Sequence, residues 1–366
     1  MPLLASAIRL FGFLVLILVV FSCDSSAQES DPEPDPDQLT IQDVPGLKTV
    51  APYPIGVAMQ SSRLGSAAHG SVMDHTFNSL TAEWEMKMNP IFSGPNSYNW
   101  TGADALVNYA ELNGMQVHGH ALVWHNATPT WLENFSGDDE AFEQLIEDYI
   151  TDVVTRYKGR VISWDVVNEV FEDNTGRLRD SVFRTRMGDD FVARLFEYAR
   201  AADPDALLFY NDYGTIWDRP KRAAMFAMID DLIVRGIPID GVGLQVHITY
   251  EFPSISEIET TMQGIVERGL KLHLSELDIR VNPQGDLTEL TPIRSEAQKE
   301  RVKALVQAFN ALPEENRFAI TTWGLRDPES WLIDFWGNPE WPLLFDASFH
   351  PKPAYVGFLE ALQESQ

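Results

Sequence analysis

The segment VISWDVVNE, residues 161–169, carries the pattern that decides the fold. It is a largely apolar run of the length of one buried strand, and it ends in the polar pair Asn168 and Glu169. Apolar runs of this length that are bounded by polar residues are typical of strands in a packed sheet. The sequence therefore predicts a strand over Val161–Val167 with reactive side chains at its carboxyl end.

The same arrangement recurs along the chain. Further strands are predicted at Ile55–Ala58, Thr76–Leu80, Gln116–His120, Leu207–Tyr210, Gly241–Gln245, Lys271–Ser275 and Ala319–Trp323. Apolar residues at three- and four-residue spacing predict helices between them, most clearly at Thr101–Asn113, Asp138–Tyr157, Asp190–Ala202, Arg219–Arg235, Ile255–Arg268 and Ser295–Ala311. This strand–helix alternation predicts an α/β protein, a single TIM (β/α)8 barrel.

Polar residues gather where the predicted strands end. They are His118 and His120, Asn168 and Glu169, Asn211 and Asp212, Gln245 and His247, and Glu276 and Asp278. In a TIM barrel the carboxyl ends of all strands meet at one face, and that face holds the active site. Because a buried carboxylate without partners costs several kcal/mol, we expect these side chains to share one site.

Composition narrows the class of partner. The chain of 366 residues has a net charge of -27 and no basic stripe, which argues against nucleic acid. Its ten tryptophans and ten tyrosines offer flat faces that suit sugar rings, although most aromatic residues belong to the core. We expect a polysaccharide partner, no cofactor, no metal and a monomeric protein.

The first residues read as an export signal followed by a tether. Residues 1–22 carry one charge, Arg9, and an apolar run over 10–21 that is too short to span a bilayer comfortably. The only cysteine, Cys23, follows directly, as in a bacterial lipobox, and would carry the lipid. Residues 23–38 are acidic and rich in proline, which predicts a disordered linker. The expected product is an exported, lipid-anchored protein at the cell envelope, with its barrel domain over 39–366.

Two other interpretations of this region stay open. The segment is also compatible with an ordinary signal peptide that happens to precede a cysteine, or with a membrane anchor that is retained.

Glu169 and Glu276 are the candidate catalytic pair. They follow the fourth and seventh predicted strands, so they face each other across the barrel mouth. Glycoside hydrolysis requires two carboxyl groups in different environments, and a retaining enzyme places them about 5 Å apart. Asp278 and His247 are placed to keep Glu276 ionised and oriented, and Asn168 is placed to hold a sugar hydroxyl.

Several ordered segments give the chain a resemblance to glycoside hydrolase family 10 from about Pro52 to Leu362. They are Glu83–Lys87, Gly119–His125, Trp164–Glu169, Asn211–Tyr213, Gly243–His247, Ser275–Asp278, Trp323-Gly324 with Asp327 and Ser330-Trp331, and Pro351–Tyr355. The resemblance implies a retaining endo-β-1,4-xylanase in bacterial lipoprotein form, with Glu169 as acid/base and Glu276 as nucleophile.

The resemblance also implies which residues bind the substrate. The glycone side, toward the non-reducing end, would be formed by Glu83, Lys87, His120, Trp124, Asn168, Gln245, Trp323 and Trp331. Tyr213 would lie on the aglycone side, beyond the bond that is cut.

Two positions depart from the family pattern. Trp84 stands where the family usually has Asn, and Ala127 stands where it usually has Gln. Both positions normally contact the sugar two units from the cleavage point on the non-reducing side. We therefore expect this subsite to be altered, with a preference for a decorated or mixed-linkage chain over plain linear xylan.

Three alternatives remain open. The same mechanism would serve another β-glycan, and a non-catalytic glycan-binding lipoprotein would use the same barrel. A metal-dependent barrel hydrolase is suggested by His118 and His120 at one strand end, with His125 and His247 as nearby candidates.

Overall fold

The computed structural model describes residues 38–365. The predicted signal peptide over 1–22, Cys23 and the linker up to residue 37 lie outside the described residues. From Leu39 onward the chain forms one compact unit. Among residues 38–365, no helix combines the length and apolar character that crossing a membrane requires.

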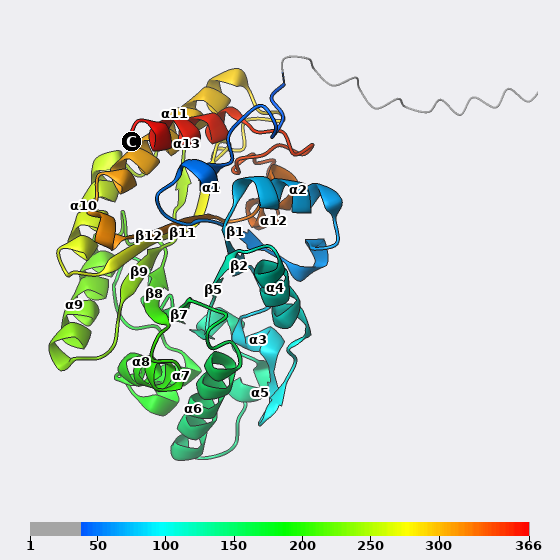
Figure 1. Ribbon diagram of the computed structural model, residues 1–366. Coiled ribbons are helices and arrows are strands. Elements are labelled where there is room, and N and C mark those ends of the chain that lie inside the picture. The colour runs from blue at the N-terminus through cyan, green and yellow to red at the C-terminus, as the bar shows by residue number, and fades with distance from the viewer. Residues whose placement is uncertain (1–37, 366) are drawn as a thin grey trace, which may run out of the picture. The chain divides into compact units, whose positions relative to one another are not determined.

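The centre of the fold is a closed barrel of parallel strands (Figure 1). Its strands in order around the ring are β1 (Ile55–Met59), β2 (Ser79–Ala82), β5 (Gln116–Gly119), β7 (Ser163–Asn168), β8 (Leu207–Asp212), β9 (Gly241–Leu244), β11 (Lys271–Arg280) and β12 (Arg317–Thr322). Pairing of β12 with β1 closes the ring. The prediction of a single TIM barrel is confirmed.

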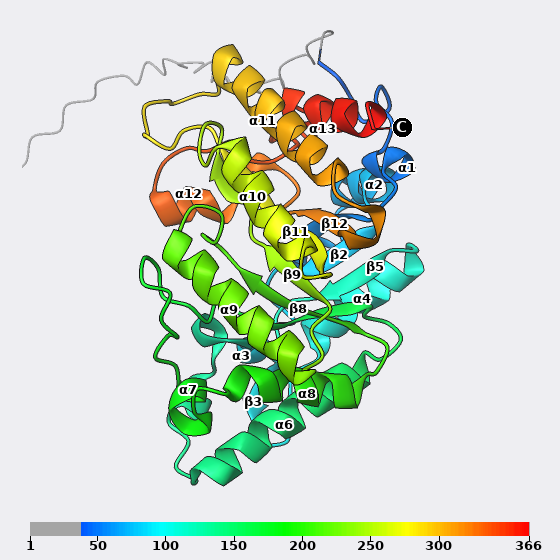
Figure 2. The same ribbon diagram turned by 90° about the vertical axis from the view of Figure 1, so that its left-hand side faces the viewer.

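Helices surround the barrel (Figures 1 and 2). They are α1 (Leu47–Val50), α2 (Ala67–Thr76), α3 (Met88–Ile91), α4 (Thr101–Leu112), α5 (Thr130–Glu133), α6 (Asp139–Arg156), α7 (Val182–Met187), α8 (Phe191–Ala202), α9 (Arg219–Arg235), α10 (Ile255–Val266), α11 (Pro292–Asn310), α12 (Trp331–Trp336) and α13 (Pro353–Gln363). The short strands β3 (Phe92–Gly94) and β4 (Ser97–Tyr98) form a hairpin, and β6 (Val123–Trp124) and β10 (His247–Thr249) extend the barrel sheet.

Local sequence signals set the ends of these helices. Asp138 and Asp218 accept the backbone N–H groups of Ala141 and Lys221, which begins α6 and α9. Ser254 and Glu257 form a reciprocal capping box at the start of α10. Helix α9 ends at Gly236, whose φ of 73° is in the left-handed region that glycine adopts at little cost.

Two predicted strands were wrong at one end. The second strand was expected to begin at Thr76, but Thr76 is the last residue of α2, which the Ser66 side chain caps, and β2 begins only at Ser79. The seventh was expected to end at Ser275, but β11 continues to Arg280 because β10 pairs with its outer half. Helix α9 has the predicted bounds, and the remaining predicted helices and strands differ by a few residues at their ends.

Side chains fill the lower part of the barrel. His118, Phe209, His273 and Phe318 come from four different strands, and their rings contact one another with centroids 4.7–6.2 Å apart. Contacts between strands that are not neighbours require these rings to lie inside the barrel. The interior is therefore packed rather than open, and polar side chains above this layer form the floor of the mouth.

Candidate active site

Glu169 and Glu276 stand at the carboxyl end of the barrel, where they are 7% and 4% exposed. Glu276 lies within β11, and Glu169 follows β7 directly. The φ of Glu169 is 57°, a left-handed conformation that costs a residue with a Cβ roughly 1–2 kcal/mol. Strain of this kind is characteristic of functional sites, where the surrounding structure holds a side chain in a fixed direction.

Neutral donors hold the Glu169 carboxyl group. The indole Nε1 of Trp124 donates to Oε2 at 2.9 Å, and the amides of Asn168 and Gln245 donate to Oε1 at 3.2 and 3.1 Å. Arg179 donates to the backbone carbonyl of Glu169, at 3.1 Å. The three side-chain donors fix the position of the carboxyl group, and Arg179 holds the backbone of the same residue.

A charged donor holds the Glu276 carboxyl group. Nε2 of His247 lies 3.1 Å from Oε2 of Glu276, and Nδ1 lies 2.9 Å from Oδ2 of Asp278. Because carboxylates only accept, both ring nitrogens donate and the imidazole is the protonated form. Trp331 also donates to Asp278, at 2.9 Å. The contact between His247, Asp278 and Glu276 that the sequence predicts is therefore present.

The pKa shifts of Glu276 and His247 agree with this contact. Burial alone would raise the pKa of Glu276, but the hydrogen bond from His247 and the charges of His120 and Lys87 outweigh it, so the pKa is lowered. Burial alone would lower the pKa of His247, but Asp278 and Glu276 raise it to about 10. At neutral pH, Glu276 is held ionised beside an imidazolium.

An amide bridge joins the two carboxyl groups. Nδ2 of Asn211 donates to Oε1 of Glu276 at 2.7 Å and to Oδ1 of Asn168 at 3.0 Å. Gln245 donates to that same Asn168 oxygen at 3.0 Å, as well as to Glu169. One hydrogen-bonded network thus contains both glutamates. Asn211 was predicted to stand at a strand end, but no role was predicted for it.

On the predicted glycone side, Lys87 lies among three indole rings. Its Nζ is 4.7 Å from the ring centroid of Trp124, 5.6 Å from that of Trp84 and 5.8 Å from that of Trp323. Burial lowers the pKa of Lys87, against the attraction of Glu276 and neighbouring carboxylates. The ammonium group is therefore placed close to Glu169 and Glu276 and sheltered from water.

Two further polar residues of the predicted glycone side have firm partners. Nδ1 of His120 lies 2.8 Å from Oδ2 of Asp165, which leaves Nε2 as the ring nitrogen available to a ligand. Gln60 donates to Glu83 at 3.0 Å, and burial raises the pKa of Glu83. Asp165 was not named as a site residue by the sequence analysis.

The two residues that depart from the family pattern differ in exposure. Trp84 is 42% exposed and is one of the few large aromatic side chains open to solvent among the described residues. Ala127 is only 1% exposed and lies in the 3-10 turn His125–Ala127. Of these two residues, only Trp84 presents a free surface to a ligand.

On the predicted aglycone side, Tyr213 rests on a buried ammonium group. Nζ of Lys221, which is fully buried, lies 3.6 Å from the Tyr213 ring centroid and contacts Asp212 at 2.9 Å and Asp173 at 3.0 Å. The Tyr213 hydroxyl donates to Asp173 at 2.7 Å and accepts from Arg179 at 3.0 Å. No role was predicted for Lys221, because a lysine in the first turn of a helix is ordinarily exposed.

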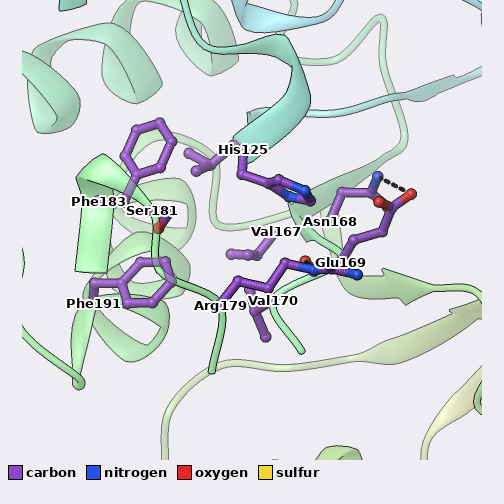
Figure 3. Close-up of a pocket in the computed structure, with 10 residues that line it drawn as sticks. His125, Val167, Asn168, Glu169, Val170, Arg179, Ser181, Phe183 and Phe191 are labelled. Atoms are coloured by element: carbon purple, nitrogen blue, oxygen red, sulfur yellow. Dashed lines mark hydrogen bonds between the residues drawn. The ribbon is translucent and has the colours of Figure 1, made fainter. Parts of the chain in front are cut away.

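Glu169 is one of the residues that line a small cavity (Figure 3). It has a volume of about 10 Å³, close to the least that holds one water molecule. His125, Arg179 and Ser181 line it together with apolar side chains. Burial and the charges of Arg179 and Lys221 lower the pKa of His125 to about 4, so this imidazole is neutral at neutral pH.

The histidines that suggested a metal site have other partners. His118 directs Nδ1 at the Ser163 hydroxyl, 2.7 Å away, and its Nε2 lies 3.0 Å from Asp165. Within residues 38–365, no group of three or more His, Cys, Asp or Glu side chains has an arrangement suited to a metal ion.

Comparison with known proteins places this site in a family. Residues 47–361 match the model of glycosyl hydrolase family 10. The chain is 40% identical over 348 residues to endo-1,4-beta-xylanase A of Cellvibrio japonicus, covering 87% of this chain and 56% of that protein. It is 35% identical over 313 residues to endo-1,4-beta-xylanase B of Paenibacillus barcinonensis, covering 81% of this chain and 94% of that protein.

A solved structure gives the same result. A mutant of xylanase 10C from Cellvibrio japonicus in complex with xylopentaose superposes with a TM-score of 0.86 at 36% identity, covering 90% of this chain and 71% of that one. With a family match over most of the chain and a shared barrel, this protein belongs to glycosyl hydrolase family 10.

Proposed function

We propose that this chain is a retaining endo-β-1,4-xylanase in which Glu169 is the general acid/base and Glu276 is the nucleophile. The observation that carries the proposal is the contrast between the two carboxyl groups. Glu276 is paired with the His247 imidazolium, whereas Glu169 receives neutral donors from Trp124, Asn168 and Gln245. Double displacement requires this difference, because one group attacks as an anion and the other transfers a proton.

In the first step, an oxygen of Glu276 attacks the anomeric carbon as the glycosidic bond breaks. Glu169 gives its proton to the leaving oxygen, and a glycosyl ester forms on Glu276. In the second step, Glu169 takes a proton from water, and the resulting hydroxide attacks the same carbon and releases Glu276 as a carboxylate. Two inversions give net retention, and Glu169 ends each cycle protonated again.

The remaining side chains suit a sugar ring. Lys87, Asn168 and Nε2 of His120 offer donors to hydroxyl groups, and the indoles of Trp323 and Trp331 offer flat apolar faces. Tyr213, held by Lys221 and Asp173, would support the sugar of the leaving group. The relatives named above are xylanases, and one of the matched structures holds xylopentaose, which supports xylan as the substrate class.

A finer proposal concerns the glycone preference. The exposed ring of Trp84 adds a stacking surface at the subsite two sugars from the cleavage point, which favours a decorated or mixed-linkage chain. Ala127 belongs to the same proposal, but at 1% exposure a glutamine there would have to displace its neighbours. A test by substitution therefore begins with Trp84 alone.

The reaction is tested with Glu276→Gln and Glu169→Gln, assayed by reducing-sugar release from linear, branched and mixed-linkage xylans. We expect each variant to lose several powers of ten in turnover, because each group acts directly in the transition state. Proton NMR of the first product anomer should show retention for the wild type. Inversion would refute the double displacement, and binding of xylan without any hydrolysis would favour a glycan-binding lipoprotein. Faster hydrolysis of another β-glycan would change the substrate and keep the mechanism.

We also propose that the chain is exported, cleaved before Cys23 and held at the cell envelope by a lipid on that cysteine, with residues 24–38 as a tether and the barrel acting as a monomer. The apolar run over residues 10–21 and the acidic, proline-rich segment after Cys23 support this proposal. Expression of Cys23→Ala in a bacterial host should release the protein from the membrane fraction. Unchanged membrane association of the variant would refute the lipid anchor.

A further inference from the structure

Helix α12 carries three aromatic side chains, named here the α12 aromatic ridge: Trp331, Phe335 and Trp336, with Phe335 in contact with both tryptophans. Ring centroids are 5.0 Å apart between Trp331 and Phe335 and 5.1 Å apart between Phe335 and Trp336. Phe335 is 65% exposed and Trp336 is 50% exposed. Side chains of this size lose much favourable burial when they stay in water, so a ridge of them indicates a binding surface.

The ridge is held rigidly from behind. The guanidinium of Arg280 lies 4.3 Å from the Trp336 ring centroid and is fixed by Nε donating to Glu340 at 2.9 Å. The other Glu340 oxygen accepts the backbone N–H groups of Val281 and Asn282, both at 3.1 Å. This buried carboxylate therefore joins the loop after β11 to the chain after α12. One face of Trp336 rests on a fixed cation, and a pre-organised ring of this kind loses little entropy when it binds.

The ridge is continuous with the candidate active site. Every second residue in the outer half of β11 is polar: Glu276, Asp278 and Arg280. Trp331 donates to Asp278, and the ring of Trp336 covers Arg280. At about 3.3 Å per strand residue, Arg280 lies roughly 13 Å along the strand from Glu276. Helix α12 thus runs outward beside β11 from the proposed nucleophile, on the side of the barrel where α9 begins (Figure 2).

We propose that the α12 aromatic ridge is a distal subsite that binds sugar rings of the polysaccharide remote from the bond that is cut. The proposal rests on the proposed function, because it takes a xylan chain already seated over Trp331 as its ligand. Apolar ring faces of a neutral glycan suit stacking on Phe335 and Trp336. The net charge of -27 opposes binding to an anionic membrane surface, the other partner that exposed tryptophans suit.

The test compares long and short substrates. The double variant Phe335→Ala/Trp336→Ala should raise KM for polymeric xylan by roughly 10-fold, from the loss of two aromatic contacts, with a much smaller rise for xylotriose. Leu112→Ala, which truncates an 86% exposed side chain at the end of α4, is the matched control and should change neither value. Equal effects on both substrates, or none on the polymer, would overturn the subsite.

A binding assay separates this proposal from the proposed reaction. Depletion of full-length protein from solution by insoluble xylan needs no turnover, and we expect the double variant to bind about 10-fold more weakly than the wild type. If the wild type hydrolyses xylan but both proteins bind equally, the subsite fails alone. If the wild type binds through the ridge without hydrolysis, the proposed reaction fails and the subsite stands. A wild-type dimer in sedimentation that the double variant abolishes would identify a second copy as the occupant and overturn the proposal.

Discussion

Replacing His247 with asparagine tests the electrostatic basis of the site. The pKa of His247 is raised from its usual 6.5 to about 10, which corresponds to about 5 kcal/mol of preferential attraction for the protonated ring. Asp278 and Glu276 share this attraction, and the His247 side chain is 16% exposed. The interaction of His247 with Glu276 therefore contributes about 2 kcal/mol. In the variant, the pKa of Glu276 should therefore rise by roughly one to two units.

The assay is kcat/KM on soluble xylan as a function of pH. Because Glu276 must be ionised to attack, the acid limb of the profile should move up by roughly one to two pH units in His247→Asn. His350→Asn, a histidine that pairs with Asp346 instead of the proposed catalytic residues, is the control and should leave the limb in place. An acid limb that coincides with that of the wild type, in a folded variant, would refute the reasoning.

Three further results are expected. Trp84→Asn should raise kcat/KM on linear xylan several-fold relative to decorated xylan, and an unchanged ratio would remove Trp84 from the subsite. Gly119→Ala should lower the free energy of unfolding in urea by about 1–3 kcal/mol or more, because its Cβ would lie 2.1 Å from the Trp164 ring; wild-type stability would contradict this packing. Lys221→Met should cost roughly 3–5 kcal/mol in the same measurement, since it removes the cation that pairs with the fully buried Asp212 carboxyl group. A stable Lys221→Met with wild-type KM would show that the ammonium does not support that ring.

The sequence was sufficient for the fold because barrel strands and helices have separate local signals. Helix α9 was predicted with the bounds Arg219–Arg235 that the structure has, since Asp218 caps its start and Gly236 ends it. The predicted start of β2 was wrong because the sequence around Thr76 is compatible with both a helix end and a strand. Only the tertiary position of α2 against the barrel decides between them.

The candidate site was predictable where the polar residues stand at strand ends, as Glu169, Gln245 and His247 do. It was not predictable where a residue acts from inside the barrel or from a helix. Asp165 sits in mid-strand, 1% exposed, and holds His120, while Lys221 reaches the site from α9. Neither residue has a local sequence pattern that distinguishes it from a core or surface residue of the same type.

Register irregularities explain how the two glutamates reach one site. His273 and Glu276 both point into the barrel although they are three positions apart, an offset that would place them on opposite faces of a regular strand. The pairing of β11 with β12 shifts between Leu274 and Leu277, and the extra residue turns the following side chains inward.

Strand β7 has the same kind of register irregularity. Its register with β8 shifts between Asp165 and Val167, so that both Asp165 and Asn168 face the mouth. Glu169 therefore follows an irregularity in β7, and Glu276 lies within the one in β11. A bulge adds one residue and re-aims everything beyond it, which simple alternation in the sequence does not reveal. The polar residues needed for the reaction can be recognised from the sequence, but their convergence depends on these two shifts.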